Sequence, residues 1–164
     1  MNSDSKLLVN LLAQCTPGNL TPEVFEAIAR VTVYPAVEFI PLREKDGEIE
    51  VLLFERPKND IIWPSMLHTP GTILRPTDND MEDVFKRLYK EELMGLLMDV
   101  PISMGFHLST NSRGRCLLLE YLLRVKGEPN KGVFYRINNL PRNFIPEQLA
   151  SLNRAVIAFR TATP

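Results

Sequence analysis

Two adjacent carboxylates, preceded by an arginine, are the side chains of this sequence whose types and spacing best suit chemistry. Glu91 and Glu92 follow Arg87 by about one helical turn, so in a helix the three side chains lie close together. Carboxylate oxygens bind Mg²⁺, and one or two carboxylates suffice where substrate phosphates complete the coordination of the ion. The alternative interpretation is that adjacent glutamates near a helix end form a solvated surface, which is the usual place for glutamate.

The helix that must position these acids is predicted over residues 81–93. Residue 88 shares a helical face with residues 91 and 92, so Leu88 puts an apolar side chain beside the two carboxylates. Asp80 is expected to cap the start of the helix, and Gly95 is expected to stop it. The apolar residues recur at i, i+3, i+4 and i+7, which is typical of one buried stripe, and they are Met81, Val84, Phe85 and Leu88.

A proline–glycine pair, Pro70-Gly71, precedes this helix, and Trp63 lies a few residues further upstream. Together with Arg87 and the Glu91-Glu92 pair, this arrangement resembles the signature of the Nudix hydrolase family. That signature runs Gly, five residues, Glu, seven residues, Arg-Glu-hydrophobic, one residue, Glu-Glu, one residue, Gly. The opening glycine, the arginine and the paired glutamates of the signature all have matches here, and the resemblance extends over most of the chain.

Three departures from the family signature bear on the site. The interval from the first glycine to the arginine is two residues longer, and Thr77 or Asn79, beside Asp78, stands where the first glutamate is expected. Leu88 occupies the position of the glutamate that follows the arginine. The last glycine, Gly95, arrives one residue late. The signature is therefore degenerate, with its paired carboxylates in place.

The resemblance implies an α+β fold, specifically a Nudix-like α/β/α sandwich with a mixed curved sheet. It also implies a hydrolase that cleaves a diphosphate bond in a nucleoside diphosphate-linked compound, with Mg²⁺ or Mn²⁺ held by Glu91 and Glu92. Arg87 would orient these carboxylates, and Gly71 would let the backbone turn close to the metal. Because Leu88 removes one ligand, we expect weak hydrolysis. The alternative is a catalytically inactive Nudix-fold module that binds a nucleotide or a protein and has a regulatory role.

The rest of the chain is expected to supply the sheet that carries this helix. Runs of β-branched and aromatic residues predict strands at residues 33–42, 49–54, 61–63, 102–108, 116–125 and 133–137. Asp46-Gly47 is a hairpin signal between the first two strands. A last helix is expected to begin near Pro146, and its predicted buried residues are Leu149, Leu152, Val156, Ile157 and Phe159.

Residues 1–30 are predicted to form an N-terminal helical extension, and residues 31–164 are predicted to form the Nudix-like domain. The first of two short helices carries apolar residues on one broad face, and Thr21-Pro22 marks the start of the second. Two short helices cannot bury both apolar faces by themselves. They therefore pack either on the main domain or on a second copy of the chain, which would make a homodimer.

Four isolated residues have two interpretations each, and a fifth, Cys116, has one. Glu120 interrupts an apolar strand, where it either replaces the lost ligand in the cleft or faces water at an edge. His68 and His107 are each either a general base or a hydrogen-bonded structural histidine, which is the commoner role. Trp63 either packs in the core, the interpretation we favour, or stacks on a base. Cys116 is expected to be an inert buried thiol.

Composition limits the class of protein. The 164 residues carry a net charge of −1, with 45% hydrophobic and 24% charged residues, which is typical of a folded domain and gives no clustered positive field for nucleic acid. Cys15 and Cys116 form no CxxC pair. Neither a membrane-spanning apolar run nor a secretory signal is found. We expect a cytoplasmic protein with a nucleotide-type small molecule as its partner and with no nucleic-acid or membrane partner.

Overall fold

The sheet at the centre of the fold is built on two long parallel strands. The computed structural model describes residues 2–16 and 20–161. β1 (Val33–Lys45) and β7 (Gly114–Lys126) run parallel and are in register from Val33 to Leu42 of β1. Parallel strands need a long crossover connection, and here the crossover carries α3 (Met81–Leu88).

Antiparallel strands extend this pair on both sides. β2 (Glu48–Glu55) pairs with β1 through the predicted hairpin, and β6 (Ile102–Asn111) pairs with β7. Shorter strands complete the sheet: β3 (Leu67–His68) and β8 (Val133–Arg136) on β2, β4 (Gly71–Ile73) on the first part of β1, and β5 (Leu97–Met98) on the end of β7.

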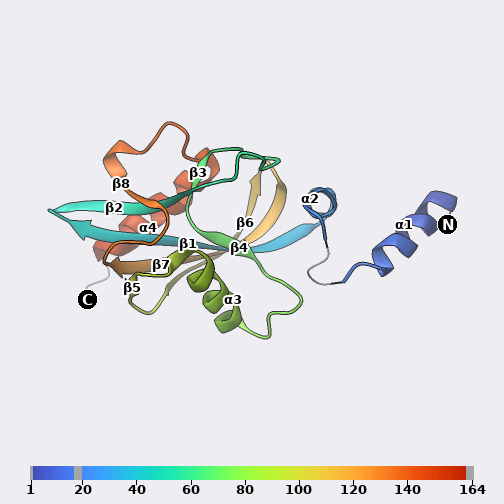
Figure 1. The fold of residues 1–164 in the computed structure, drawn as a ribbon, viewed down its shortest axis with the longest axis horizontal. Coiled ribbons are helices and arrows are strands. Elements are labelled where there is room, and N and C mark those ends of the chain that lie inside the picture. The colour runs from blue at the N-terminus through green and yellow to red at the C-terminus, as the bar shows by residue number, and fades with distance from the viewer. Residues whose placement is uncertain (1, 17–19, 162–164) are drawn as a thin grey trace.

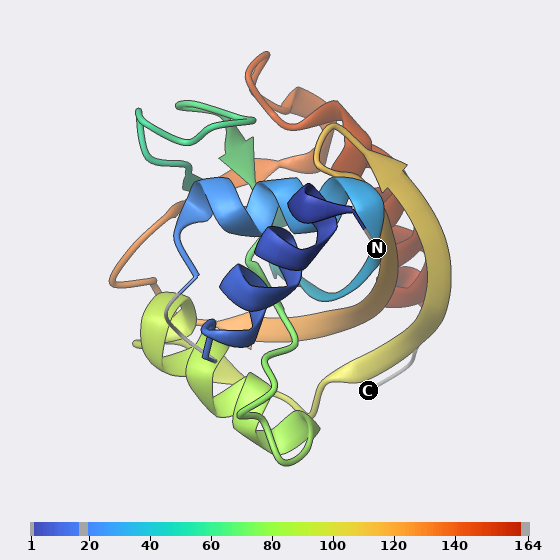
Figure 2. The same ribbon diagram turned by 90° about the vertical axis from the view of Figure 1, so that its right-hand side faces the viewer.

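Helices cover both faces of the curved sheet (Figures 1 and 2). Successive residues of a strand point to opposite faces, so Ile40 packs on the side of α4 (Leu149–Thr161) and Phe39 packs on the side of α3. Two short 3₁₀ helices, η2 (Ile137–Asn139) and η3 (Pro146–Gln148), lead into α4. The predicted α+β sandwich with a mixed curved sheet is confirmed.

The helix predicted over residues 81–93 divides into two parts. α3 ends at Leu88, and one π-helical turn, η1 (Tyr89–Leu93), continues it. Asp80 caps the start as expected, because its side chain accepts a hydrogen bond from the Asp83 amide at 3.1 Å. A π turn is wider than an α turn, so the side chains at 91 and 92 do not keep regular α-helical spacing from Leu88.

Two expectations about secondary structure and burial are wrong. Residues 61–63 form a bend instead of a strand, because the Asp60 carboxylate accepts hydrogen bonds from the amides of Ile62 and Trp63 at 3.0 and 2.8 Å. In α4, Leu149 and Ile157 are 44% and 64% exposed. Leu149 is the first residue of the helix, and Ile157 points at least 100° away from the buried stripe, which lies on Leu152, Val156 and Phe159.

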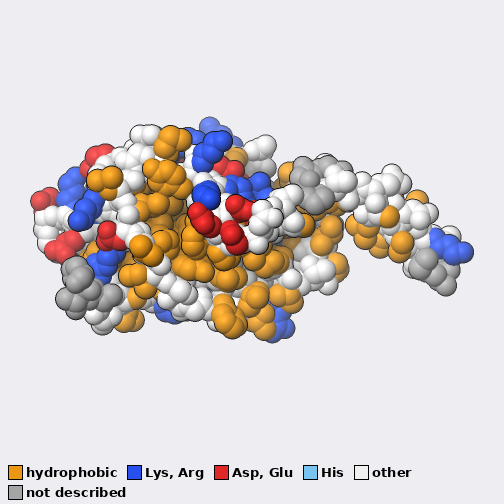
Figure 3. Space-filling view, turned by 90° about the horizontal axis from the view of Figure 1, so that it is seen from below, with side chains coloured by type: hydrophobic (Ala, Val, Ile, Leu, Met, Phe, Trp, Pro, Cys, Tyr) orange, Lys and Arg blue, Asp and Glu red, His pale blue; other side chains and the backbone are white. Residues whose placement is uncertain are grey.

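The two N-terminal helices differ in how they contact the domain. α1 (Ser3–Ala13) projects away from the sheet (Figure 1) and buries no side chain, so its leucines are exposed (Figure 3). α2 (Pro22–Val31) starts at the predicted Thr21 cap and lies against β1 and β7, where Ala29 packs on Tyr34. The domain boundary at residue 30 and the homodimer stay predictions.

No helix among the described residues has both the length and the apolar character needed to cross a membrane. The cytoplasmic location and the lack of a nucleic-acid partner stay predictions.

Deleting residues 2–16 is expected to leave the free energy of unfolding within about 0.5 kcal/mol of the full chain, because α1 buries no side chain. Gly114→Ala is expected to lower it by more than about 1 kcal/mol. A Cβ at Gly114, where φ is +150°, would lie 2.6 Å from the carbonyl oxygen of Ala29 in α2. Urea denaturation followed by circular dichroism measures both, and a deletion as costly as Gly114→Ala would contradict this description of α1.

Candidate functional site

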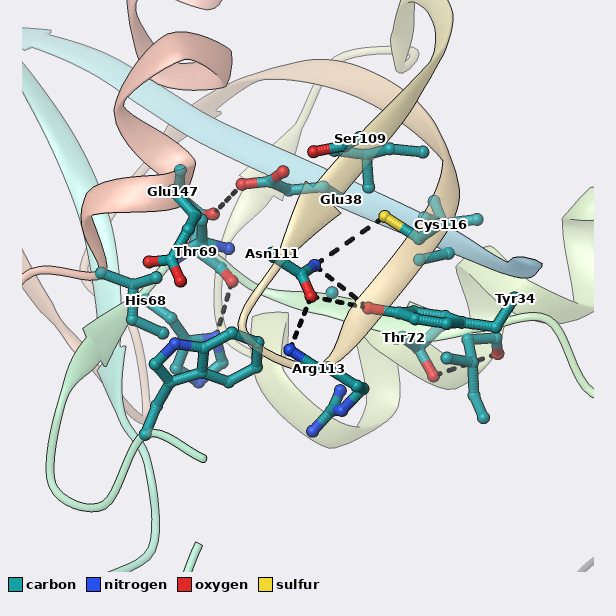
Figure 4. Close-up of a pocket in the computed structure, with 18 of the residues that line it drawn as sticks. Tyr34, Glu38, His68, Thr69, Thr72, Ser109, Asn111, Arg113, Cys116 and Glu147 are labelled. Atoms are coloured by element: carbon teal, nitrogen blue, oxygen red, sulfur yellow. Dashed lines mark hydrogen bonds between the residues drawn. The ribbon is translucent and has the colours of Figure 1, made fainter. Parts of the chain in front are cut away.

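A pocket of about 140 Å³ opens on the face of the sheet that α4 packs against. β1 pairs with β4 along residues 36–38 and with β2 only from residue 42 onwards, so the sheet parts between these two neighbours. The walls come from segments that are distant in sequence: β1, the β3–β4 connection, the loop after β2, the β6–β7 turn and η3 (Figure 4). The pocket is therefore a product of the long-range strand pairing.

Trp63, Arg56 and Arg113 line one side of this pocket, which we call its mouth. The Arg113 guanidinium carbon lies 5.1 Å from the centroid of the Trp63 ring and 5.3 Å from that of Phe25 in α2. Its Nε donates a hydrogen bond to Oε1 of the buried Glu26 at 2.7 Å. The favoured interpretation of Trp63 as a core residue is wrong, because its side chain lines the pocket.

His68 lies in the pocket wall as a neutral histidine. Its Nδ1 is 2.7 Å from the carbonyl oxygen of Thr69, so Nδ1 carries a proton and donates it to that oxygen. Burial, followed by the charge of Arg56, lowers the pKa of His68 to about 4. The ring therefore offers Nε2 as a hydrogen-bond acceptor at neutral pH.

Glu38 is a buried acid in the wall of the pocket, and the sequence interpretation did not identify it. Its side chain is nearly inaccessible, and Oε1 accepts a hydrogen bond from the Thr69 hydroxyl at 2.5 Å. The β1–β7 register places Glu38 directly beside Glu120. Burial raises the pKa of Glu38 to about 7, and the charge of Glu120 adds to the increase.

Glu120 fits neither of its two predicted roles. It is 1% exposed, so it does not face water. It also does not replace the lost ligand, because it lies on the α4 side of β7, whereas α3 packs on the opposite side. Arg154 of α4 donates hydrogen bonds to both its carboxylate oxygens, at 2.6 and 2.9 Å. His107 lies 3.7 Å from the same carboxylate.

Of the family signature, Gly71 lines the pocket, whereas the α3 residues lie on the other side of the sheet. Leu88 is 1% exposed and belongs to the core beneath α3. Arg87 donates a hydrogen bond to Asp78 at 2.8 Å and another to the carbonyl oxygen of Ile73 at 3.4 Å. Arg87 thus ties the long loop before α3 to the helix, and its predicted role in orienting the two carboxylates stays a prediction.

Glu91 and Glu92 differ in their surroundings. Glu91 is exposed, whereas Glu92 is partly buried and its Oε2 has no hydrogen-bond partner. Burial raises the pKa of Glu92 to about 7, the Glu91 charge adds to this, and the charges of Arg56 and Lys131 oppose it. Arg56 also lines the pocket, so the charge of a pocket residue acts on Glu92.

These residues do not fit a ready-made metal centre. No group of three or more His, Cys, Asp and Glu side chains within the described ranges is placed to hold a metal ion, and the third position of the predicted set is Leu88, buried in the core. Gly71 has a structural reason to be glycine, because a Cβ there would lie 2.8 Å from the carbonyl oxygen of Val37. The roles predicted for Glu91, Glu92 and Gly71 stay predictions.

Comparison with solved structures identifies the fold of this chain. No family model and no curated protein matches the sequence. The NUDIX domain of Shewanella oneidensis NrtR, solved in complex with ADP ribose, has a TM-score of 0.55 and 14% identity, covering 97% of this chain and 99% of that chain. An Ap4A hydrolase from C. elegans has a TM-score of 0.57 and 14% identity, covering 79% of this chain and 100% of that chain.

A mutT/nudix family protein from Listeria innocua gives a similar result, with a TM-score of 0.57, 12% identity, and coverage of 79% of this chain and 96% of that chain. At such identities the likeness shows the fold alone. This chain has the Nudix fold, as its degenerate signature predicts.

Leu88→Ala is expected to lower the free energy of unfolding by about 2–5 kcal/mol, the usual cost of truncating a buried leucine. The matched variant Glu91→Gln, one helical turn later on the surface, is expected to change it by less than about 0.5 kcal/mol. Urea denaturation at neutral pH measures both. Equal effects of the two substitutions would contradict the placement of Leu88 in the core.

Glu38→Gln is expected to stabilise the fold at pH 8, by on the order of 1–3 kcal/mol, and to have little effect at pH 4. In the unfolded chain the carboxyl loses its proton near its ordinary pKa of 4.5, and in the folded protein near pH 7. The stability of the wild-type protein therefore falls as the pH rises from 4.5 to 7, and the loss is complete above pH 7. Denaturation curves at both pH values measure the difference, and an equal effect at pH 4 and pH 8 would contradict it.

Proposed function

We propose that this protein binds a small molecule of the nucleoside diphosphate class in the pocket described above, with little or no hydrolysis of its diphosphate. The observation that carries this proposal is the contrast between the two faces of the sheet. The pocket combines an aromatic and arginine-lined mouth with polar walls, whereas the helix position that would complete a metal site carries the core residue Leu88.

The size of the pocket favours one ring system as its occupant. A cavity of about 150 Å³ accommodates a benzene molecule, and this pocket measures about 140 Å³. A heterocyclic base therefore fits inside, and the sugar and phosphates of the same ligand remain at the mouth. Trp63 at the mouth offers the kind of flat surface on which bases stack.

Two arginines at the mouth suit the phosphates. Arginine offers a planar set of donors that matches phosphate oxygens. Arg56 and Arg113 are held by Asp60 and Glu26, at 2.6 and 2.7 Å, so both guanidinium groups are in place before a ligand binds. The ADP ribose complex of the NrtR NUDIX domain supports this ligand class.

Weak hydrolysis with Mg²⁺ or Mn²⁺ at Glu91 and Glu92 is the second candidate function. One observation favours it: a carboxylate oxygen of Glu92 is buried without a partner, beside the arginine that also lines the pocket. A diphosphate that extends from the pocket past Arg56 would come close to this carboxylate.

Titration of the fluorescence of Trp63, the single tryptophan of the chain, tests the proposal. ADP ribose is expected to quench it saturably, with the same affinity in Mg²⁺ and in a chelator. Arg113→Ala is expected to weaken binding about tenfold. The matched variant Arg115→Ala, which changes an exposed neighbour outside the pocket, is expected to bind like the wild-type protein.

A release assay with ADP ribose and ATP, in Mg²⁺ and in Mn²⁺, separates the two candidates. Turnover that disappears in Glu92→Gln would support the hydrolase and contradict a pure binding role. Absence of turnover in the wild-type protein, with binding by fluorescence, supports the binding role. If Leu88→Glu then gains turnover, the missing carboxylate is the reason for the inactivity.

A further inference from the structure

Glu38 is a buried carboxyl group whose burial lowers the stability of the fold. It lies within an apolar stretch of β1, between Val37 and Phe39, and only 4% of the residue is exposed to solvent. Burying a carboxyl group costs free energy unless it is paired or neutralised. An apolar side chain would avoid this cost, so the acid at this position calls for a functional explanation.

The charges around Glu38 leave it without a cation of its own. The hydrogen bonds of Arg154 go to Glu120, Ser151 and His107. Among the residues that the structure describes, no basic side chain forms an ion pair with Glu38. Two neighbouring acids that share the field of one guanidinium cannot both ionise at low cost. Glu120 is the member paired with Arg154, and Glu38 is the member that keeps a proton below about pH 7.

A neutral carboxyl group has a different use from an ionised one. It offers one O–H donor together with acceptor oxygens, and at Glu38 one oxygen already accepts a hydrogen bond from the Thr69 hydroxyl. Figure 4 shows Glu38 among the labelled residues around the pocket, joined to Thr69 by this bond. The Ser151 hydroxyl of α4 also hydrogen-bonds to Glu38. With both hydroxyls donating, the neutral carboxyl keeps its own proton for an acceptor atom of a group that occupies the pocket.

We propose that Glu38 determines which group the pocket accepts, by donating a hydrogen bond from its neutral carboxyl to a ring nitrogen or carbonyl oxygen of an uncharged heterocycle. This inference rests on the proposed function and assigns an orientation to the ligand. The base lies inside the pocket against Glu38, and the phosphates stay outside with the arginines. A phosphate inside would lie beside Glu147, an acid that lines the pocket and repels it.

The pH dependence of ADP ribose binding tests this role. If only the neutral form of Glu38 binds, affinity is constant below about pH 6 and falls about tenfold between pH 6 and pH 8. Glu38→Gln, whose amide keeps both a donor and an acceptor but does not titrate, is expected to bind with the same affinity at every pH. Glu38→Met, which has neither, is expected to bind at least tenfold more weakly than Glu38→Gln throughout.

The other charged and titratable groups around Glu38 serve as an internal control, because Glu38→Gln leaves all of them in place. They come from every element around it, and they are Arg56 of the loop after β2, His68 of β3, His107 of β6, Cys116 and Glu120 of β7, Glu147 of η3 and Arg154 of α4. A pH dependence that persists in Glu38→Gln would belong to these groups and would overturn the inference.

The same titrations separate a failure of this inference from a failure of the proposed function. ADP ribose binding that is independent of pH, and equal in Glu38→Gln and Glu38→Met, would overturn the role of Glu38 and leave the binding function standing. Ribose 5-phosphate, which lacks the heterocycle, is expected to bind at least tenfold more weakly than ADP ribose; equal binding would overturn the proposed orientation. If neither probe binds the folded wild-type protein, both proposals fail.

Discussion

The parallel pairing of β1 with β7 sets two buried carboxyl groups side by side, and the character of the pocket follows from that pairing. In this register Glu38 and Glu120 are direct neighbours, and of these two acids Arg154 hydrogen-bonds only to Glu120. One acid is therefore part of an ion pair, whereas the other lines the pocket and keeps its proton below about pH 7. The same pairing brings the β6–β7 turn next to α2, which is how Arg113 comes to meet Phe25 and Glu26.

The opposite face of the sheet, which α3 covers, is held by apolar packing. Leu88 belongs to a core of aliphatic and aromatic side chains from β1, β2 and β7, so this helix contributes to the interior. Glu91 and Glu92 follow on a wider π turn, one exposed and one partly buried. The structure thus keeps the Nudix fold while the more elaborate polar environment lies in the pocket, with Arg56 between the two regions.

Local patterns in the sequence predicted the local structure well. The strands at 33–42 and 49–54, the Asp80 cap and the start of α3 follow from residue types over a few positions. The parallel β1–β7 register is a long-range contact, and no short pattern encodes it. Without that register, neither the pocket nor the position of Glu38 beside Glu120 can be predicted. One local pattern does point to Glu38, because it interrupts an apolar strand in the same way as Glu120.

We propose that the ligand is recognised in the pocket on the α4 side, without a metal beside the helix. A crystal structure of the protein with ADP ribose and Mn²⁺, with anomalous scattering recorded for manganese, tests this proposal. We expect the adenine ring inside the pocket in contact with Glu38, with no manganese peak at Glu91 and Glu92. A manganese ion that joins these two glutamates to the diphosphate would contradict it.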